Sequence, residues 1–199
     1  MEFQDVVRQR YATKKFDGRA IPQDKLDELL ELIRLAPSAL NLQPWKIRIV
    51  DDPEMKAKLA PATGNEEMIN TASHVLVFCA DTDIETLVGK TMDGMAKAGV
   101  PGEIMTHVRE LCDEMVLCLS TEQRKEWSTH QVYLALANAV NGAKALGFDS
   151  CPVTHFKPEE FAQALEIPPH LYPVVICPLG YGAHPAKPKL RFPIEEIVL

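Results

Sequence analysis

The sequence contains none of the short motifs by which several common enzyme classes are recognised. It has no GxSxG elbow, no Walker phosphate loop, no GxGxxG turn and no HExxH pair. Its six histidines are scattered, so their spacing predicts no metal site. A metalloenzyme and a hydrolase with a side-chain nucleophile are therefore both without support.

Cysteine and positive charge are also too scarce for several other classes. The five cysteines are odd in number and form no CxxC pair, which favours reduced thiols in a cytoplasm over a disulfide framework. The formal net charge of −7 disfavours general nucleic-acid binding. The first residues lack the basic and apolar regions of a signal peptide. We expect a cytoplasmic protein that binds neither nucleic acid nor membrane.

The 199 residues, 46% of them hydrophobic and 25% charged, suit one globular domain over 1–199 with a helical excursion at about 82–124. The chain is organised around residues 128–146, an apolar helix with no clear polar face. Ser120 and Gln123 have capping-box spacing upstream of it, and Gly147 supplies its stop. Its polar residues, Asn138, Asn141 and Lys144, argue against a membrane span. We predict a core helix that also contributes to a subunit interface.

Hydrophobic periodicity predicts the remaining elements. Apolar residues at helical spacing indicate a helix over 22–36, and Asp52 before Pro53 indicates another helix start. Strands are predicted over 46–50, 75–80 and 172–179, with a strand that runs into a loop from Phe148. Residues 81–126 are predicted to be helical with a break at 99–102, and a further short helix follows Lys157.

The predicted helical stretch has no aromatic residue between Asp81 and Glu126, but it is rich in methionine. Its methionines are either soft filler of the core or an adaptable wall over a ligand. The second interpretation predicts a pocket roofed by aliphatic side chains and methionine, which would accept substrates of varied shape. The residues concerned are Met92, Met95, Met105 and Met115.

Three polar segments are candidates for ligand binding. The basic segment Arg10 to Phe16 is either a solvated patch or an anion site. The loop Pro37 to Trp45 carries the amides of Asn41 and Gln43, which either face a planar ligand or satisfy the loop's own backbone. The tail 185–193 is extended by its prolines, so its cations at positions 187, 189 and 191 point one way.

The order of these segments resembles that of the FMN-dependent nitroreductase family, especially oxygen-insensitive nitroreductases and dihydropteridine reductases. The resemblance rests on RYATKKFD at 10–17, PSALNLQPW at 37–45, TASHVLVFCA at 71–80, QVYL at 131–134, ALGFD at 145–149 and KLR at 189–191. It implies an α+β nitroreductase-like fold, with a central, mostly antiparallel sheet flanked by helices. It also implies an intertwined homodimer in which residues 194–199 pack against the partner.

The resemblance assigns cofactor-binding roles to residues from both subunits. Arg10, Lys189 and Arg191 would hold the FMN phosphate, and Lys14 would reach the N1/O2 side of the ring. Asn65 would bind the ring edge, and backbone N–H groups of Thr154 or His155 would lie near N5 and O4. The full set is Arg10, Tyr11, Ala12, Lys14, Asn65, Pro152, Val153, Thr154, His155, Lys189 and Arg191, with Pro37, Ser38, Ala39 and Asn41 from the partner subunit.

Three departures separate this chain from the family pattern. Ala12 stands where relatives often have a serine that binds the phosphate, which removes one hydrogen bond. Thr154-His155 stands where relatives often have glycine after an acidic residue near N5. The aromatic lid of close relatives has no counterpart between Cys79 and Glu126.

The function implied by the resemblance is that of an NAD(P)H oxidoreductase. NADH or NADPH would reduce FMN by hydride transfer, and a nitroaromatic or quinone would then take its place, which gives ping-pong kinetics. Lys14 and His155 are candidates for proton transfer, and no metal is expected. The alternatives are a reductase of another acceptor (a pteridine, an enone or a halogenated aromatic), a non-catalytic flavin-binding protein, or a phosphate- or nucleic-acid-binding module.

Overall fold

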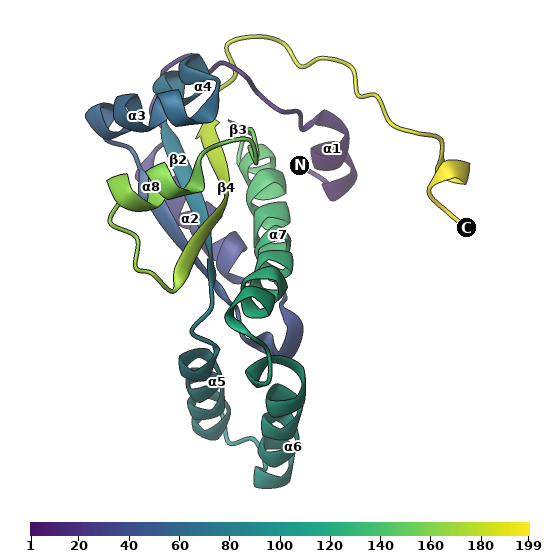
Figure 1. Cartoon of the computed structure of the whole chain (residues 1–199). Helices are drawn as coiled ribbons and strands as arrows, with labels where there is room; N and C mark the ends of the chain where they lie inside the picture. The colour runs from purple at the N-terminus through teal and green to yellow at the C-terminus, as the bar shows by residue number, and fades with distance from the viewer.

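The computed structural model describes residues 1–199 and is built around one four-stranded sheet (Figure 1). The strands are β1 (Trp45–Val50), β2 (His74–Asp81), β3 (Asp149–Ser150) and β4 (Leu171–Gly180). They lie in the order β1-β2-β4-β3, and every neighbouring pair is antiparallel. The predicted α+β architecture with an antiparallel sheet is confirmed.

The central strand β2 is buried along its whole length, so its side chains form a core on each face of the sheet. Leu76 and Phe78 face α2 (Gln23–Arg34) and α7 (Thr121–Ala145). Val75 and Val77 belong to the core on the opposite face, which is covered by α3 (Pro53–Leu59), α4 (Glu66–Thr71) and α8 (Pro158–Ala164). A strand buried on both sides needs a continuous apolar run, which is the pattern in the sequence.

Helix α7 begins and ends where its capping residues predict. Ser120 and Gln123 form the reciprocal capping box, and Gly147 adopts a φ of +93° after the last turn. Near the C-terminal end of α7, a Cβ on Gly142 would lie 2.9 Å from Leu29 Cδ1, so glycine is needed for the close approach of α2. Its opposite face leaves Tyr133 43% exposed and Leu134 41% exposed within one chain.

The helical excursion projects beyond the end of the sheet (Figure 1). It comprises α5 (Ile84–Lys97), α6 (Gly102–Cys112) and a π-helical segment (Asp113–Leu117), around a small apolar core of its own. The predicted break at 99–102 is confirmed. The prediction of unbroken helix from there to Glu126 was wrong, because the chain leaves the helix at Cys118–Ser120 and Ser120 starts α7 as its N-cap.

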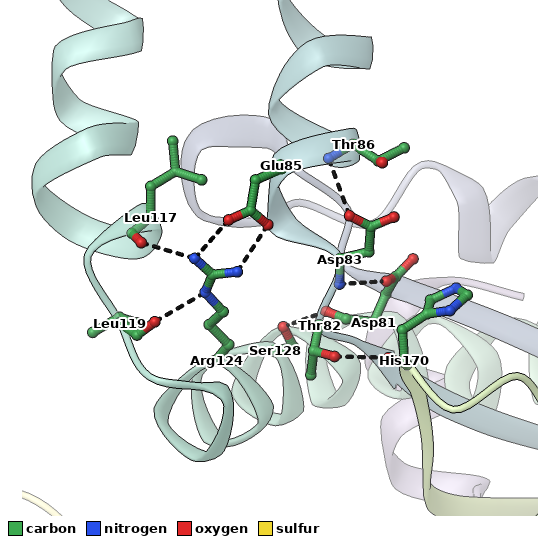
Figure 2. A network of polar contacts seen from close by, with 10 residues as sticks. All are labelled: Asp81, Thr82, Asp83, Glu85, Thr86, Leu117, Leu119, Arg124, Ser128 and His170. Atoms are coloured by element: carbon green, nitrogen blue, oxygen red, sulfur yellow. Dashed lines mark hydrogen bonds and ion pairs between the residues drawn. The ribbon is translucent and has the colours of Figure 1, made fainter.

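Arg124 ties the root of this excursion to α7, as Figure 2 shows. Its guanidinium donates two hydrogen bonds of 2.8 Å to the Glu85 carboxylate. It also donates to the carbonyl oxygens of Leu117, at 2.8 Å, and Leu119, at 3.0 Å. One side chain therefore joins α5, the end of the π-helical segment and the first turn of α7.

The two ends of the chain lie on the same side of the molecule. Helix α1 (Phe3–Gln9) precedes the first basic segment, and the tail after β4 extends away from the sheet to a short 3₁₀ turn (Ile194–Glu196) on the side of α1 (Figure 1). Two further 3₁₀ turns, η1 (Ala39–Asn41) and η2 (Ala60–Thr63), precede β1 and α4. None of the helices combines the length and apolar character needed to cross a membrane.

Candidate functional site

Two segments that are distant in the sequence form a cleft of about 560 Å³. The Tyr11 hydroxyl donates to the His184 carbonyl at 2.8 Å, and the Ala183 N–H donates to the Lys15 carbonyl at 3.0 Å. The Lys189 ammonium donates to the carbonyl of Arg10. The lining residues are Arg10, Tyr11, Ala12, Thr13, Lys14, Lys15, His184, Pro185, Lys187, Pro188, Lys189, Leu190 and Arg191. We call this the basic cleft.

The basic cleft is lined by six Lys and Arg side chains and by no carboxylate. Lys15 forms an ion pair with Glu67, but none of the other five has a carboxylate partner. Desolvation, together with the nearby charges of Arg10 and Arg191, lowers the pKa of Lys189 below its ordinary value. Uncompensated like charges at close range favour the binding of an anion.

Thr13 adds an unsatisfied polar group to the wall of the basic cleft. Its side chain is only 1% exposed, and its Oγ1 has no hydrogen-bond partner in the chain. Buried hydroxyls without partners are rare, because an unmade hydrogen bond is costly. The cleft therefore combines free cations with a hydroxyl that lacks a partner.

The segment after β3 lies beside the cleft. The Lys14 ammonium is 3.3 Å from Sγ of Cys151, and Val153 exchanges two backbone hydrogen bonds with Ile176. Beyond this pairing, the N–H groups of Thr154 and His155 donate to no acceptor in the chain. Both residues are exposed, so two backbone donors are available to a ligand.

Asn65 lies next to the same segment but already has a structural role. Its Oδ1 accepts a hydrogen bond of 3.2 Å from the Met68 N–H and so caps α4. The preceding Gly64 has a φ of +67°, and a Cβ there would lie 3.7 Å from Cδ2 of His155. The Asn65 amide nitrogen makes no hydrogen bond within this chain, so it is the part of this side chain that remains free to donate to a ligand.

The loop 37–41 lies at the opposite end of the fold from the basic cleft. Ala39 N–H donates to Gln131 Oε1 near the middle of α7, whereas Lys144 near the end of α7 donates to Asp149. These two α7 residues are thirteen positions apart, which corresponds to about 20 Å of helix. The sheet shows the same separation. Trp45, which follows the loop, pairs with Ala80 at one end of β2, whereas β3 pairs with the part of β4 that lies beside His74 at the other end. One chain therefore does not bring its loop 37–41 to its own basic cleft.

A second pocket, of about 490 Å³, lies between that loop and α5. Of the four methionines of the predicted wall, Met95 lines this pocket. Met92, Met105 and Met115 line neither cavity; Met92 packs against the core of the excursion, and Met115 is 47% exposed. The lining residues are Asn41, Leu42, Gln43, Trp45, Lys46, Leu87, Lys90, Thr91, Gly94, Met95, Ala98 and Val100. We call this the η1–α5 pocket.

The sequence matches the family model described as "Nitroreductase family" over residues 7–181. The chain belongs to the nitroreductase family. It is 32% identical over 190 residues to an NADH dehydrogenase of Thermus thermophilus, and the alignment covers 96% of this chain and 91% of the relative. It is 28% identical over 214 residues to the oxygen-insensitive NAD(P)H nitroreductase of Salmonella typhimurium, and this alignment covers 98% of this chain and 97% of the relative.

A solved structure from Exiguobacterium sibiricum, assigned as a nitroreductase and determined in complex with FMN, has the same fold. Its TM-score is 0.88 at 24% identity, and the match covers all of this chain and 96% of that chain. This likeness concerns the fold, and it agrees with the membership in the nitroreductase family.

Sequence reasoning missed several residues of this nitroreductase-family chain that line the cavities or lie beside them. Thr13 and Lys15 flank Lys14 in an extended segment, and strict alternation would have turned them away from the ligand side. Cys151 was passed over because a lone thiol carries no spacing signal. Lys46 and Lys90 come from two elements that meet only in the folded chain. No local pattern would have identified them.

Proposed function

We propose that this nitroreductase-family protein is an FMN-dependent NAD(P)H oxidoreductase that reduces nitroaromatics, quinones or related acceptors with ping-pong kinetics. The proposal rests on one observation above all, the five cations of the basic cleft that have no carboxylate partner. The phosphate of FMN is a dianion with three acceptor oxygens, and it fits this charge and hydrogen-bonding capacity. FMN would supply the hydride-transfer chemistry once bound.

Each predicted residue has a defined task in this proposal. Arg10, Lys189 and Arg191 bind the phosphate from both walls of the cleft, and Thr13 supplies a hydroxyl beside Ala12. Lys14 places a positive charge at the pyrimidine side of the ring, held by Cys151. The free N–H groups of Thr154 and His155 hydrogen-bond the opposite edge of the ring, and the Asn65 amide donates to it. Lys14 and His155 remain the candidates for proton delivery.

We also propose an obligate homodimer with two flavin sites in its interface. Because loop 37–41 and the basic cleft lie towards opposite ends of the sheet, we assign Pro37, Ser38, Ala39 and Asn41 to the partner's cofactor. The exposed apolar side chains of the tail and of α7 support association, because burying them removes apolar area from water. They include Phe192, Ile194, Ile197, Val198, Tyr133 and Leu134. We expect one cytoplasmic domain over 1–199, with the excursion at about 82–124.

The absorption spectrum of the purified protein tests the proposal directly. We expect the yellow spectrum of bound FMN, which bleaches on anaerobic addition of NADH or NADPH and returns with a nitroaromatic or a quinone. A flavin that stays oxidised with both donors would indicate a flavin-binding protein without reductase activity. A colourless protein that does not take up added FMN would contradict the cofactor assignment.

The phosphate contacts are tested with Arg10→Ala and Arg191→Ala. Each substitution should weaken FMN binding by about 1.5–3 kcal/mol, roughly 10- to 150-fold in Kd. The charge-matched control is the double variant Arg8→Ala, Arg48→Ala, which removes two exposed arginines outside the cleft. Unchanged flavin retention in the Arg10, Arg191 double variant would refute the phosphate assignment.

Sedimentation tests the assembly. We expect a dimer with two flavins at micromolar protein concentration. A folded monomer that retains flavin would contradict the shared site, since a single chain does not bring loop 37–41 to its own cleft.

A further inference from the structure

The η1–α5 pocket is lined by two lysines and by apolar side chains. Its cations are Lys46 from β1 and Lys90 from α5, and no Asp or Glu lines it. Neither lysine forms an ion pair anywhere in the chain. The walls are made by Leu42, Trp45, Leu87, Met95, Ala98 and Val100. This arrangement suits a ligand with an apolar body and a negatively charged end.

The loop that closes the pocket is held in a strained conformation. Leu40, Asn41 and Gln43 have φ values of 55°, 54° and 48°, in the left-handed region that side chains other than glycine rarely adopt. Strain of this kind persists only where the surroundings fix it, and it is concentrated at ligand sites.

Three contacts fix this loop. Gln43 N–H donates to Ser38 Oγ at 2.9 Å, and Ala39 N–H donates to Gln131 Oε1 at 2.9 Å. Leu42 is buried in the apolar core of the excursion. The loop is therefore anchored on α7 at one end and on the excursion at the other. Gln43 Nε2 donates to Asn41 Oδ1 at 3.2 Å, and Asn41 lines the pocket.

We infer that the η1–α5 pocket binds the electron acceptor and that it selects acceptors carrying a carboxylate. Lys46 and Lys90 bind the carboxylate, and the apolar walls hold the ring. This inference rests on the proposed function, because Asn41 is the residue through which this loop would reach the partner's cofactor. The volume of about 490 Å³ is sufficient for a substituted benzene ring.

A matched pair of acceptors isolates the carboxylate. 4-Nitrobenzoate and 4-nitrobenzamide differ in charge but hardly in shape. Their intrinsic reactivity is the same for every variant, so a change in the ratio of their kcat/KM values between the wild type and a variant reports recognition of the charge. We expect the wild-type enzyme to favour nitrobenzoate. Lys90→Gln and Lys46→Gln should each raise the KM for nitrobenzoate about 3- to 10-fold and leave nitrobenzamide within about 2-fold. Lys97→Gln, at an exposed α5 position outside the pocket, is the control.

A second pair of variants tests occupancy of the pocket rather than charge. Gly94 lines the pocket and Gly89 does not, although both lie in α5 and a Cβ at either would meet nothing within 4 Å. Gly94→Leu fills the pocket and should raise the KM for both acceptors. Gly89→Leu places the same side chain on the same helix outside the pocket and should leave both KM values unchanged.

The outcomes separate this inference from the proposed function. An enzyme that contains flavin and reduces both acceptors, but has the same ratio in the wild type and in both Lys→Gln variants, overturns the inference alone. A protein that reduces no acceptor would contradict the proposed function. Calorimetry would then measure whether 4-nitrobenzoate binds to the pocket at all. Binding that is unchanged in the Lys46, Lys90 double variant would refute a carboxylate site, whereas binding lost there and kept in Lys97→Gln would support it.

Discussion

Lys14 Nζ lies 3.3 Å from Sγ of Cys151, and it has no carboxylate partner. Cys151 is fully buried, so its position is set by packing and by the hydrogen bond of its N–H to Pro178. A thiol sulfur is a weak acceptor, and it orients the ammonium without neutralising it. The direction of the ammonium is therefore restricted.

Replacing Cys151 should weaken flavin binding through Lys14. We expect Cys151→Ala to lose about 1 kcal/mol, roughly fivefold in Kd, because the ammonium is no longer oriented. Lys14→Met should lose more, and Cys151→Ala should add little in the Lys14→Met background. Fluorescence titration of FMN measures these affinities. Cys79→Ala, which alters a buried thiol of the core, is the control; equal affinities for it and for Cys151→Ala would contradict the positioning role.

Arg124 should contribute more to stability than its ion pair with Glu85 suggests. Arg124→Met removes the donors to the Leu117 and Leu119 carbonyls as well as the ion pair, and its side chain is only 16% exposed. We expect a loss of about 1–3 kcal/mol in the free energy of unfolding. Glu85→Gln, at a side chain that is 61% exposed, should cost less than about 1 kcal/mol. Urea denaturation compares the two variants, and equal losses would show that the carbonyl contacts contribute nothing.

One thiol per chain should react in the native protein. Cys118 is exposed, whereas the other four cysteines are buried. Burial raises the pKa of both Cys79 and Cys177 to about 12, so neither forms the reactive thiolate at neutral pH. Titration with a chromogenic disulfide should count one thiol before unfolding and five afterwards. Cys118→Ser should abolish the native reaction, and fast labelling that persists in this variant would contradict the assignment.

His74 should make stability fall at mildly acidic pH. Burial lowers its pKa below the ordinary value of 6.5, so below that pH the unfolded chain binds a proton that the folded chain resists. Stability is therefore retained above pH 6.5 and is lost as the pH falls towards the lower folded pKa. Carboxylates such as Glu31 and Glu85 act in a separate, more acidic range, because their lowered pKa values start from 4.5.

Thermal unfolding between pH 5 and 7 measures this dependence. His74→Gln should flatten the curve in that range while leaving the more acidic limb in place. An unchanged slope in the variant would show that another group is responsible.

The elements that were predicted well are those whose signal is local. Strand β2 was found because a strand buried on both faces is apolar throughout, and α7 was placed by the Ser120 capping box and by Gly147. The break at 118–120 was implied by the Ser120 cap but was left out of the helix predicted over 81–126, because Cys118 and Leu119 are ordinary helix residues. That break depends on Arg124 binding the freed carbonyls from the next helix, which no local pattern reveals.

The candidate site was predictable only in part. The basic segment and the basic tail were both visible, but their meeting depends on the pairing of Phe16 with Gly182, a contact across most of the chain. Of the η1–α5 pocket, the sequence indicated Asn41, Gln43 and Met95, whereas Lys46 and Lys90 join it from separate elements and were missed. Residue type indicates what a side chain can bind, and the fold decides which side chains share a ligand.

The span of α7 between Gln131 and Lys144 makes this helix intolerant of changes in length. Insertion of one turn would shift loop 37–41 relative to the basic cleft by about 5.4 Å, and a single added residue would rotate one anchor by about 100° around the helix axis. Insertions at Gly99, in the open turn between α5 and α6, leave this spacing untouched. Length variation among functional versions of this chain should therefore accumulate at that turn and be absent from the span of α7 that joins the two anchors.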